Sequence, residues 1–288
     1  SDVQARISIG PVDPTTSNAY DIDTDWDWHQ LSRGLVSHGK ATIHGAEKTT
    51  FAQLDQDALA GDQSIQLATP VSGWNVGDRL VLTGTEFIKD DFNNGNGVLE
   101  RPMQTEVLTI TAISPDGRTI SFAETLAFDH IGHGTDILGR PMMPYVANYS
   151  RNVLVETENH ENLAANQRGH VMFMHNPEVD IRYAEFFELG RTDKKTPLDD
   201  FQLNGRNRVL DENGDPIPGA RTNIRGRYAF HLHRTGVQSQ DITAKAIGNS
   251  VWGSPGWGFV HHDSHADFNW NASYDVDGAH FVAEVGSE

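Results

Sequence analysis

The residues best suited to chemistry lie late in the chain, in the run GRYAFHLH over residues 226–233. Side chains alternate between the two faces of a β-strand, so a strand here would put Arg227, His231 and His233 on one face and the apolar residues between them in a core. Two imidazoles at positions i and i+2 can reach one metal ion, and without a metal either can act as a general acid or base. Arg227 could neutralise an anionic group of a substrate. The competing interpretation is a pair of solvated surface histidines.

Two further histidine runs could complete the same site. GFVHHDSH spans residues 258–265, where neighbouring side chains face opposite ways, so His261 and His262 are expected to play different roles. RGHVMFMH spans residues 168–175 and ends in a histidine. If the three runs stack in neighbouring coils, their imidazoles gather into one outward patch with strands about 4.8 Å apart. The candidate catalytic residues are Arg227, His231, His233 and His261, and the candidate metal ligands are His175, His231, His233 and His262.

The ligand type narrows the choice of cofactor. Neutral imidazole suits Zn²⁺ and other borderline transition ions, whereas Ca²⁺ prefers oxygen ligands, so a divalent metal is expected with Zn²⁺ favoured over Ca²⁺. Such a metal could act as a Lewis acid or lower the pKa of a bound water. The sequence contains no Walker loop, dinucleotide fingerprint or GxSxG elbow, so we expect neither a nucleotide cofactor nor a serine hydrolase.

Residues around the histidines could bind a sugar polymer. Arg234 follows the HLH motif directly and, with Arg227, could bind substrate carboxylates. Trp252 and Trp257 flank the run GSPG and could stack on sugar rings, the alternative being that both indoles pack in a core.

The elements that must position these residues are short β-strands. Alternating or β-branched runs dominate, helical periodicity is scarce, and turn sequences such as PDG at 115–117 separate the runs. The fold class is therefore expected to be all-β. The expected strands include residues 42–44, 64–67, 79–82, 106–113, 119–122, 152–156, 171–174 and 179–187.

An internal repeat indicates how the strands are arranged. Shifting the C-terminal part of the chain by 22 residues superposes Asn249 on Asn271, Trp252 on Tyr274, Gly256 on Gly278, Phe259 on Phe281 and Val260 on Val282. A period in the low twenties with recurring Asn, Gly, aromatic and β-branched residues is typical of a right-handed parallel β-helix, in which each coil stacks on the next.

The pattern changes twice along the chain. Residues 1–48 are interpreted as a lead-in and first β-helix coil at the end of an upstream domain, and residues 49–148 as a small β-barrel-like domain, inserted in or preceding the helix. Residues 149–288 are expected to form the parallel β-helix, with a long loop at about 192–222. The chain starts without Met and stops within a strand-like pattern, which favours a fragment of a longer polypeptide.

Several motifs together resemble a known family. GRYAFHLHRTG, AIGNSVWGSPGWGFVHHDSHADF, SHGKATIHGAEKTTF and SGWNVGDRLVL resemble segments of the cell-surface hyaluronidases of animals, the transmembrane and cell-migration-inducing types, and of their bacterial relatives. The animal motif reads approximately GxYPIHFH; this chain keeps its glycine, tyrosine and both histidines and has Ala229 and Phe230 in place of Pro and Ile.

The resemblance covers most of the chain from about residue 33. It implies a right-handed parallel β-helix with a compact β-barrel beside it, after a domain named for its eight glycines that would lie mainly upstream of residue 33. It also implies depolymerisation of hyaluronan or another uronate-containing polysaccharide outside the cell.

The charge distribution is compatible with an anionic polymer but not with nucleic acid. Forty acidic and 22 basic side chains give a net charge of −18, whereas phosphate binding needs a basic footprint. Between Arg182 and Arg234, however, ten Lys or Arg stand against eight Asp or Glu, so this segment carries +2 and the remainder −20. A cleft lined by this segment could therefore bind an anionic sugar polymer.

These observations lead to one expectation with two alternatives. We expect an extracellular or cell-surface enzyme that degrades a hyaluronan-like or other uronate-containing polysaccharide by hydrolysis. The first alternative is a polysaccharide lyase acting by β-elimination, and the second is a non-catalytic carbohydrate-binding or adhesive module of a large surface protein. No apolar run approaches the ~20 residues of a transmembrane helix, so no membrane insertion is expected.

Overall fold

The computed structural model describes residues 4–11, 20–22, 26–27, 29–86, 104–200, 222–237 and 242–284. The chain divides into two compact units, one made of Ser1–Ala46 and Arg151–Glu288 and the other of Glu47–Ser150. The regular structure of the described residues is β-strand, apart from two short 3₁₀ helices, η2 (His160–Asn162) and η3 (Ala165–Gln167). No helix in this part of the chain is long and apolar enough to cross a membrane. The expected all-β class is therefore confirmed.

The first unit consists of three parallel sheets. Sheet A contains, in spatial order, β1 (Ala5–Ile9), β10 (Val153–Thr157), β13 (Ala184–Phe187), β16 (Ser250–Ser254) and β19 (Ala272–Val276). Sheet B contains β2 (Gly34–Ser37), β11 (His170–Met174), β14 (Phe230–Gly236), β17 (Phe259–Ser264) and β20 (Phe281–Glu284). Sheet C contains β18 (Ala266–Asn269), β15 (Ala244–Ile247), β12 (Val179–Arg182) and β3 (Ala41–His44).

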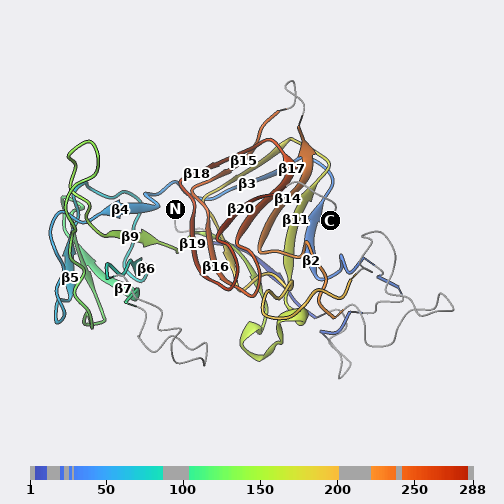
Figure 1. The fold of residues 1–288 in the computed structure, drawn as a ribbon, viewed down its shortest axis with the longest axis horizontal. Helices are drawn as coiled ribbons and strands as arrows, with labels where there is room; N and C mark the ends of the chain where they lie inside the picture. Colours follow the sequence, from blue (N-terminus) through green and yellow to red (C-terminus); the bar gives the residue numbers. More distant parts are fainter. Residues whose placement is uncertain are drawn as a thin grey trace. The chain divides into compact units, whose positions relative to one another are not determined.

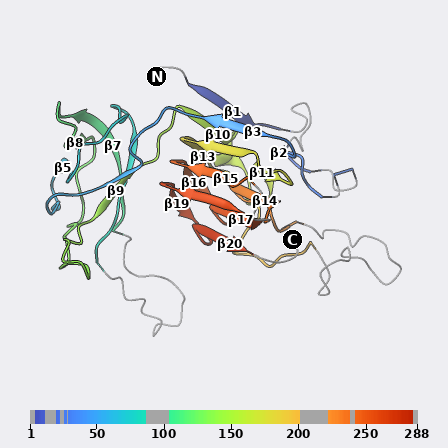
Figure 2. The ribbon, with the colours of Figure 1, turned by 90° about the horizontal axis from the view of Figure 1, so that it is seen from above.

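The chain passes through the three sheets in turn, which makes this unit a parallel β-helix. Strands β1, β2 and β3 form the first coil, and β10, β11 and β12 stack on them as the second, each in parallel register with its predecessor. Further coils add β13 to β20 in the same order (Figures 1 and 2). The expected parallel β-helix is thus confirmed by the pairing of its own strands.

The 22-residue repeat corresponds to one coil. Trp252 pairs with Tyr274 on sheet A, and Phe259 pairs with Phe281 on sheet B, each pair being 22 residues apart. At the same position of consecutive coils, the backbone N–H and the side-chain Nδ2 of Asn249 donate to Oδ1 of the asparagine 22 residues later, at 2.9 and 3.2 Å. The repeated asparagine therefore supports the chain where it turns into sheet A.

The inner faces of the sheets enclose an apolar core. Phe173 and Phe230 from sheet B lie with ring centroids 5.7 Å apart, and Phe259 follows 5.4 Å from Phe230 on the next coil. Phe186 reaches Phe230 from sheet A at 5.1 Å. Burying a side chain of this size stabilises the fold by roughly 1.5–3 kcal/mol, so this aromatic row anchors sheet B and the residues that alternate with it.

One expected strand is wrong in its extent. The run 179–187 forms two strands in two different sheets, β12 and β13, because Tyr183 between them has a positive φ of 52°. A single left-handed residue turns the chain from sheet C into sheet A, and the apolar pattern that continues through it does not reveal the turn.

The second unit contains one antiparallel six-stranded sheet. Its order is β4 (Phe51–Gln53), β9 (Tyr145–Asn148), β6 (Arg79–Leu82), β7 (Glu106–Ile113), β8 (Thr119–Phe122) and β5 (Ser64–Gln66). A bridge between Leu54 and Leu67, directly after β4 and β5, brings the two edge strands together. Both leucines are buried in an apolar core, as expected for a small barrel. In the sequence, this unit is inserted between β3 and β10.

Candidate metal centre

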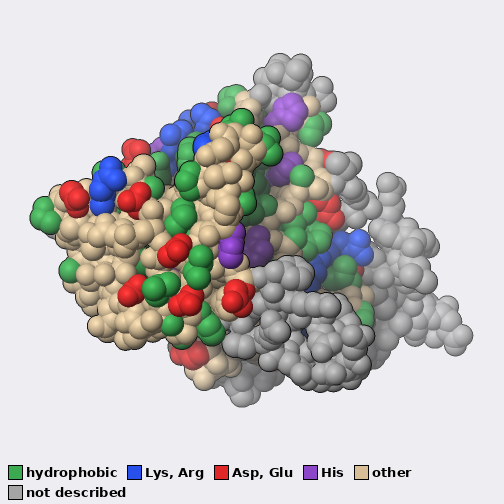
Figure 3. Space-filling view, turned by 60° about the vertical axis from the view of Figure 1, so that its left-hand side comes forward, with side chains coloured by type: hydrophobic (Ala, Val, Ile, Leu, Met, Phe, Trp, Pro, Cys, Tyr) green, Lys and Arg blue, Asp and Glu red, His purple; other side chains and the backbone are tan. Residues whose placement is uncertain are grey.

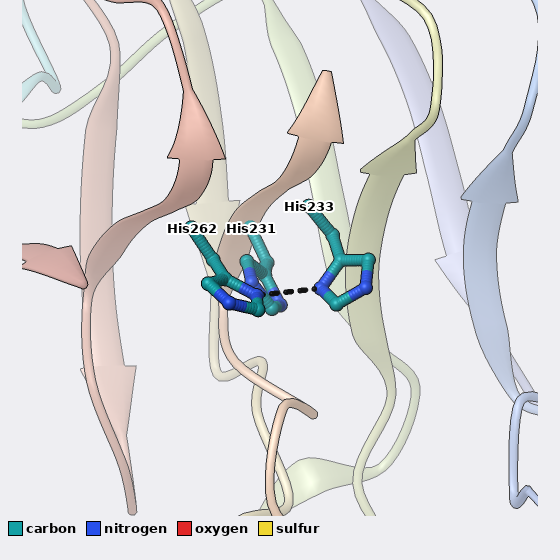
Figure 4. Close-up of side chains that lie close together, drawn as sticks. All are labelled: His231, His233 and His262. Carbon is teal, nitrogen blue, oxygen red and sulfur yellow. Dashed lines mark hydrogen bonds between the residues drawn. The ribbon is translucent and has the colours of Figure 1, made fainter. Parts of the chain in front are cut away.

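Three imidazoles converge on sheet B. His231 and His233 alternate on β14, and His262 lies beside His233 in the register of the neighbouring strand β17. Nitrogen atoms of all three lie within 4.8 Å of one another, and Nδ1 of His233 is 3.2 Å from Nδ1 of His262. Figure 4 shows the three rings grouped on one side of the sheet. The strand alternation of the HLH motif and the stacking of coils together create this cluster.

The cluster is buried, which contradicts the competing interpretation of two solvated surface histidines. His231 and His262 have no exposed surface, and His233 is 9% exposed. The three side chains do point away from the core that holds Phe230 and Leu232, but other residues cover them. The ring of Tyr228, for example, lies 5.2 Å from that of His231.

Burial keeps His231 and His233 neutral. Desolvation is the main reason why the pKa of His231 falls to about 3 and that of His233 to about 4. The neighbouring imidazoles lower both pKa values further, because two adjacent imidazolium ions would repel each other. Neutral imidazole is the form that binds a metal ion, so the environment favours the ligand state over the protonated state.

Surrounding groups orient two of the rings. Nδ1 of His231 donates to the carbonyl oxygen of Gly226 at 3.0 Å, so Nε2 is the ring nitrogen that carries the lone pair. Nε2 of His262 lies 3.4 Å from a carboxylate oxygen of Asp263, so Nδ1 of that ring faces His233. A carbonyl or carboxylate behind an imidazole is the usual support of a metal-binding histidine.

The spacing fits a transition metal. Two nitrogens held at the usual zinc distance and a tetrahedral angle lie about 3.3 Å apart, close to the 3.2 Å between His233 and His262. These three residues could therefore hold a metal ion, with three protein ligands as in catalytic zinc sites.

His175 lies next to the cluster but is not one of its three converging residues. It follows β11 with a positive φ of 59°, so it leaves the strand instead of continuing its alternation. Its ring contacts His233 edge-on at a centroid distance of 5.7 Å and stacks on His38 at 5.5 Å. The side chain is exposed, which places it at the rim of the site.

His261 lies on the opposite face, so its predicted place beside the other histidines is corrected. It pairs in register with Leu232, whose side chain is in the core, and its ring contacts Phe268 at 5.5 Å. The alternation that brings His262 to the cluster necessarily turns His261 away from it.

Strand alternation also fails for the residues before β14. The strand begins at Phe230, so the rule does not reach Arg227 and Tyr228. Arg227 donates instead to the carbonyl oxygens of His29 and Gln30, and Tyr228 lies on the histidine side and not in the core. The alternation argument for a face shared by Arg227 and the two histidines is therefore incorrect, although the charge of Arg227 still lowers the pKa of both His231 and His233.

The remaining predicted substrate-binding residues lie in three different places. Arg234 is partly exposed after the HLH motif, with Nε 3.9 Å from the carboxylate of Asp263, and so belongs to the rim. Trp257 packs 4.8 Å from Tyr228 beneath the ammonium group of Lys194, beside the histidine site. Trp252 lies on sheet A against the ring of Tyr274, away from the cluster.

Sequence reasoning missed one residue that the repeat could have revealed. Glu284 stands 22 residues after His262 and pairs with it in register on β20, so both occupy the same row of sheet B. Its Oε2 is buried and has no hydrogen-bond partner within the described part of the chain. Glu284 is not among the residues whose ligand atoms converge, so it shares the row of the cluster without joining it.

The surface of the molecule carries charges of both signs. Figure 3 shows acidic side chains, lysines or arginines, and histidines on the face in view.

Comparisons with known proteins return distant structural similarity. No protein-family model and no curated protein sequence matches the chain. Among solved structures, the tailspike protein gp49 from Pseudomonas phage LKA1 is similar at 10% identity and a TM-score of 0.26, over 85% of this chain and 32% of that one. The gp54 tailspike of Acinetobacter baumannii bacteriophage AP22, solved in complex with A. baumannii capsular saccharide, is similar at 11% identity and a TM-score of 0.27, over 91% and 43%.

The tailspike gp61 of Pseudomonas phage phi297 is similar at 8% identity and a TM-score of 0.25, over 85% of this chain and 34% of that one. The chain thus spans less than half the length of each of these three tailspikes.

Proposed function

We propose that this chain is a metal-dependent polysaccharide-degrading enzyme whose centre is formed by His231, His233 and His262. The observation that carries the proposal is the convergence of three buried imidazoles from two coils, with His231 oriented by the carbonyl of Gly226. Metal analysis of the purified protein tests the centre directly: one equivalent of transition metal, with Zn²⁺ favoured, is expected and is lost in His233→Ala.

The residues of the proposed centre have two kinds of role: metal ligands inside it, and proton-transfer or substrate-binding residues at its edge. A metal bound to the three histidines would supply Lewis acidity and an activated water. His175, exposed beside His233, is placed to donate or accept a proton at the edge of the centre. Arg234 presents a partly exposed guanidinium at the same edge, where it can bind a carboxylate of the polymer.

The substrate class rests on the motif resemblance and on the local charge. The kept glycine, tyrosine and two histidines of the hyaluronidase-like motif support a hyaluronan-like or other uronate-containing polysaccharide. The positive balance between Arg182 and Arg234 supports an anionic polymer. Such polymers lie outside cells, so we propose an extracellular or cell-surface site of action.

The decisive experiment is a depolymerisation assay. The metal-loaded protein is incubated with hyaluronan, chondroitin, alginate and polygalacturonate, and chain length and near-ultraviolet absorbance are followed. Shortening without new absorbance indicates hydrolysis, and shortening with it indicates the unsaturated product of β-elimination. His233→Ala is expected to abolish shortening, whereas His265→Ala, an exposed histidine close by, is the matched control and is expected to keep it.

Two results would contradict the proposal, one by excluding catalysis and the other by excluding the histidine centre. If the metal-loaded protein binds a polymer but shortens none, and His233→Ala binds it equally well, the chain is a carbohydrate-binding module and the histidine cluster is structural. If no metal is retained while shortening persists in His233→Ala, the proposed centre is wrong.

A further inference from the structure

A second group of buried basic side chains lies in the β-helix unit, where the sheet B strands β2, β11 and β14 begin. Backbone hydrogen bonds bring its members together: His170 N–H donates to the carbonyl of Arg33 at 3.3 Å, and Arg191 N–H to that of Arg227 at 2.8 Å. Gly190 and Gly169, the neighbours of Arg191 and His170, are also joined, at 2.7 Å. Three arginines and a histidine from four segments of the chain therefore surround one corner of sheet B.

Several nitrogens of this group lack acceptors. Arg191 is 2% exposed; its Nη2 donates to the carbonyl of Gln30, but Nε and Nη1 are buried without a hydrogen-bond partner in the described residues. Arg33 uses Nε and Nη1 on backbone carbonyls and leaves Nη2 buried without a partner there. His170 is fully buried, and neither of its ring nitrogens has a hydrogen-bond partner in the described residues. Buried polar groups in folded proteins are almost always paired, so this concentration of unpaired donors needs an explanation.

Among the described residues, two carboxylates act on this corner: Asp21 attracts Arg33, and Asp27 attracts Arg191. The oxygens of Asp27 already accept from the backbone N–H groups of Leu31 and Ser32 and from the hydroxyl of Ser32. Burial and the neighbouring Arg227 and Arg33 lower the pKa of Arg191, a sign that its charge is poorly compensated. A guanidinium does not lose its proton in proteins, so a buried arginine is stabilised by a negative charge bound beside it.

We infer that Arg33, His170 and Arg191 form a buried binding site for a small anion, separate from the proposed metal centre. The unpaired donors would bond the anion, and its negative charge would compensate the buried guanidinium groups. The backbone of residues 29–33 lies over the arginines and accepts from Arg191 and Arg227, so the site suits an enclosed ion rather than a polymer. The inference goes beyond the proposed function and does not depend on it.

Anion-dependent thermal stability of the whole chain tests the site. At fixed pH and ionic strength, a bulky sulfonate salt is replaced stepwise by chloride, bromide or acetate. The melting temperature is expected to rise saturably, by about 5–10 °C at a hundredfold excess over the dissociation constant. If halide raises the melting temperature at lower concentrations than acetate does, the site prefers an inorganic ion. If acetate acts at the lower concentrations, the site prefers a carboxylate.

Arg191→Gln separates anion binding from a merely structural role. The variant is expected to lose the anion dependence and, in the sulfonate salt, to melt no lower than the parent protein, because it removes an uncompensated charge. Arg6→Gln, an exposed arginine of the same unit, is the control and is expected to keep the dependence. A variant that melts lower in every salt by the same amount would overturn the inference.

A bromide derivative of the unaltered protein keeps the test independent of whether Arg191→Gln folds. An anomalous peak at hydrogen-bonding distance from Arg191 and His170 supports the site. No peak, together with a melting temperature that depends on ionic strength alone, refutes it.

Discussion

Metal-linked stability is the most direct quantitative consequence of the histidine cluster. A ligand that binds only the folded protein at a hundred times its dissociation constant raises the free energy of unfolding by about 2.7 kcal/mol. For a chain of this size that corresponds to a rise in melting temperature of about 5–10 °C. Zn²⁺ added to metal-free protein should produce this shift, followed by calorimetry at pH 7.5, where the buried imidazoles are neutral.

His262→Ala is the informative perturbation because it removes the ligand supplied by the neighbouring coil and leaves the HLH motif intact. If the loss of this ligand raises the dissociation constant for Zn²⁺ by about a hundredfold, the Zn²⁺ concentration used for the parent protein equals the dissociation constant of the variant. Zn²⁺ then raises the free energy of unfolding of the variant by only about 0.4 kcal/mol and its melting temperature by about 1–2 °C. His265→Ala should retain the full shift. An equal shift in the parent protein and in His262→Ala would refute the assignment of this histidine as a ligand.

Three further predictions follow from the same structure. Lowering the pH from 7 to 5 should destabilise the metal-free protein, since His231 and His233 stay neutral when folded but take up protons at their ordinary pKa when unfolded. In urea unfolding, the free energy of unfolding should fall by an amount approaching 1.4 kcal/mol per pH unit for each histidine. The variant His231→Gln should show a smaller fall per pH unit. Phe230→Ala should cost about 3–5 kcal/mol in urea unfolding, because its ring contacts phenylalanines from two sheets; a loss below 1 kcal/mol would contradict this packing. Asn249→Ala should cost about 1–3 kcal/mol, because it leaves the backbone N–H of Ala184 without its acceptor, and amide exchange at that position should accelerate.

Much of the fold could be predicted because its signals are local and periodic. The expected strands 79–82, 106–113 and 119–122 match β6, β7 and β8, since each is a short run rich in apolar and β-branched residues. The 22-residue shift matches the last coil, in which β18, β19 and β20 stack on β15, β16 and β17. Earlier coils are longer: Val153 pairs with Ala184, and Phe230 pairs with Phe259. The split at Tyr183 was not predicted, since a single left-handed residue leaves no periodic trace.

The candidate site was predictable in part for the same reason. The alternation in HLH correctly placed His231 and His233 on one face, and the opposite orientations of His261 and His262 were expected. Glu284 was missed although the repeat places it in the row of His262. Arg227 was misplaced because strand alternation was extended to residues that precede the strand.

The sequence by itself determined the all-β class, the period of the last coil and the chemical type of the site, because residue identity and spacing along the chain carry that information. Only the tertiary structure decided which histidines meet. Stacking of coils brings His262 to His233 and turns His261 into the core. It also decided that the cluster is buried, and that Arg191 lies under the backbone of Gln30, which is 161 residues away in the sequence. Burial and its electrostatic consequences depend on such distant contacts, which no local pattern encodes.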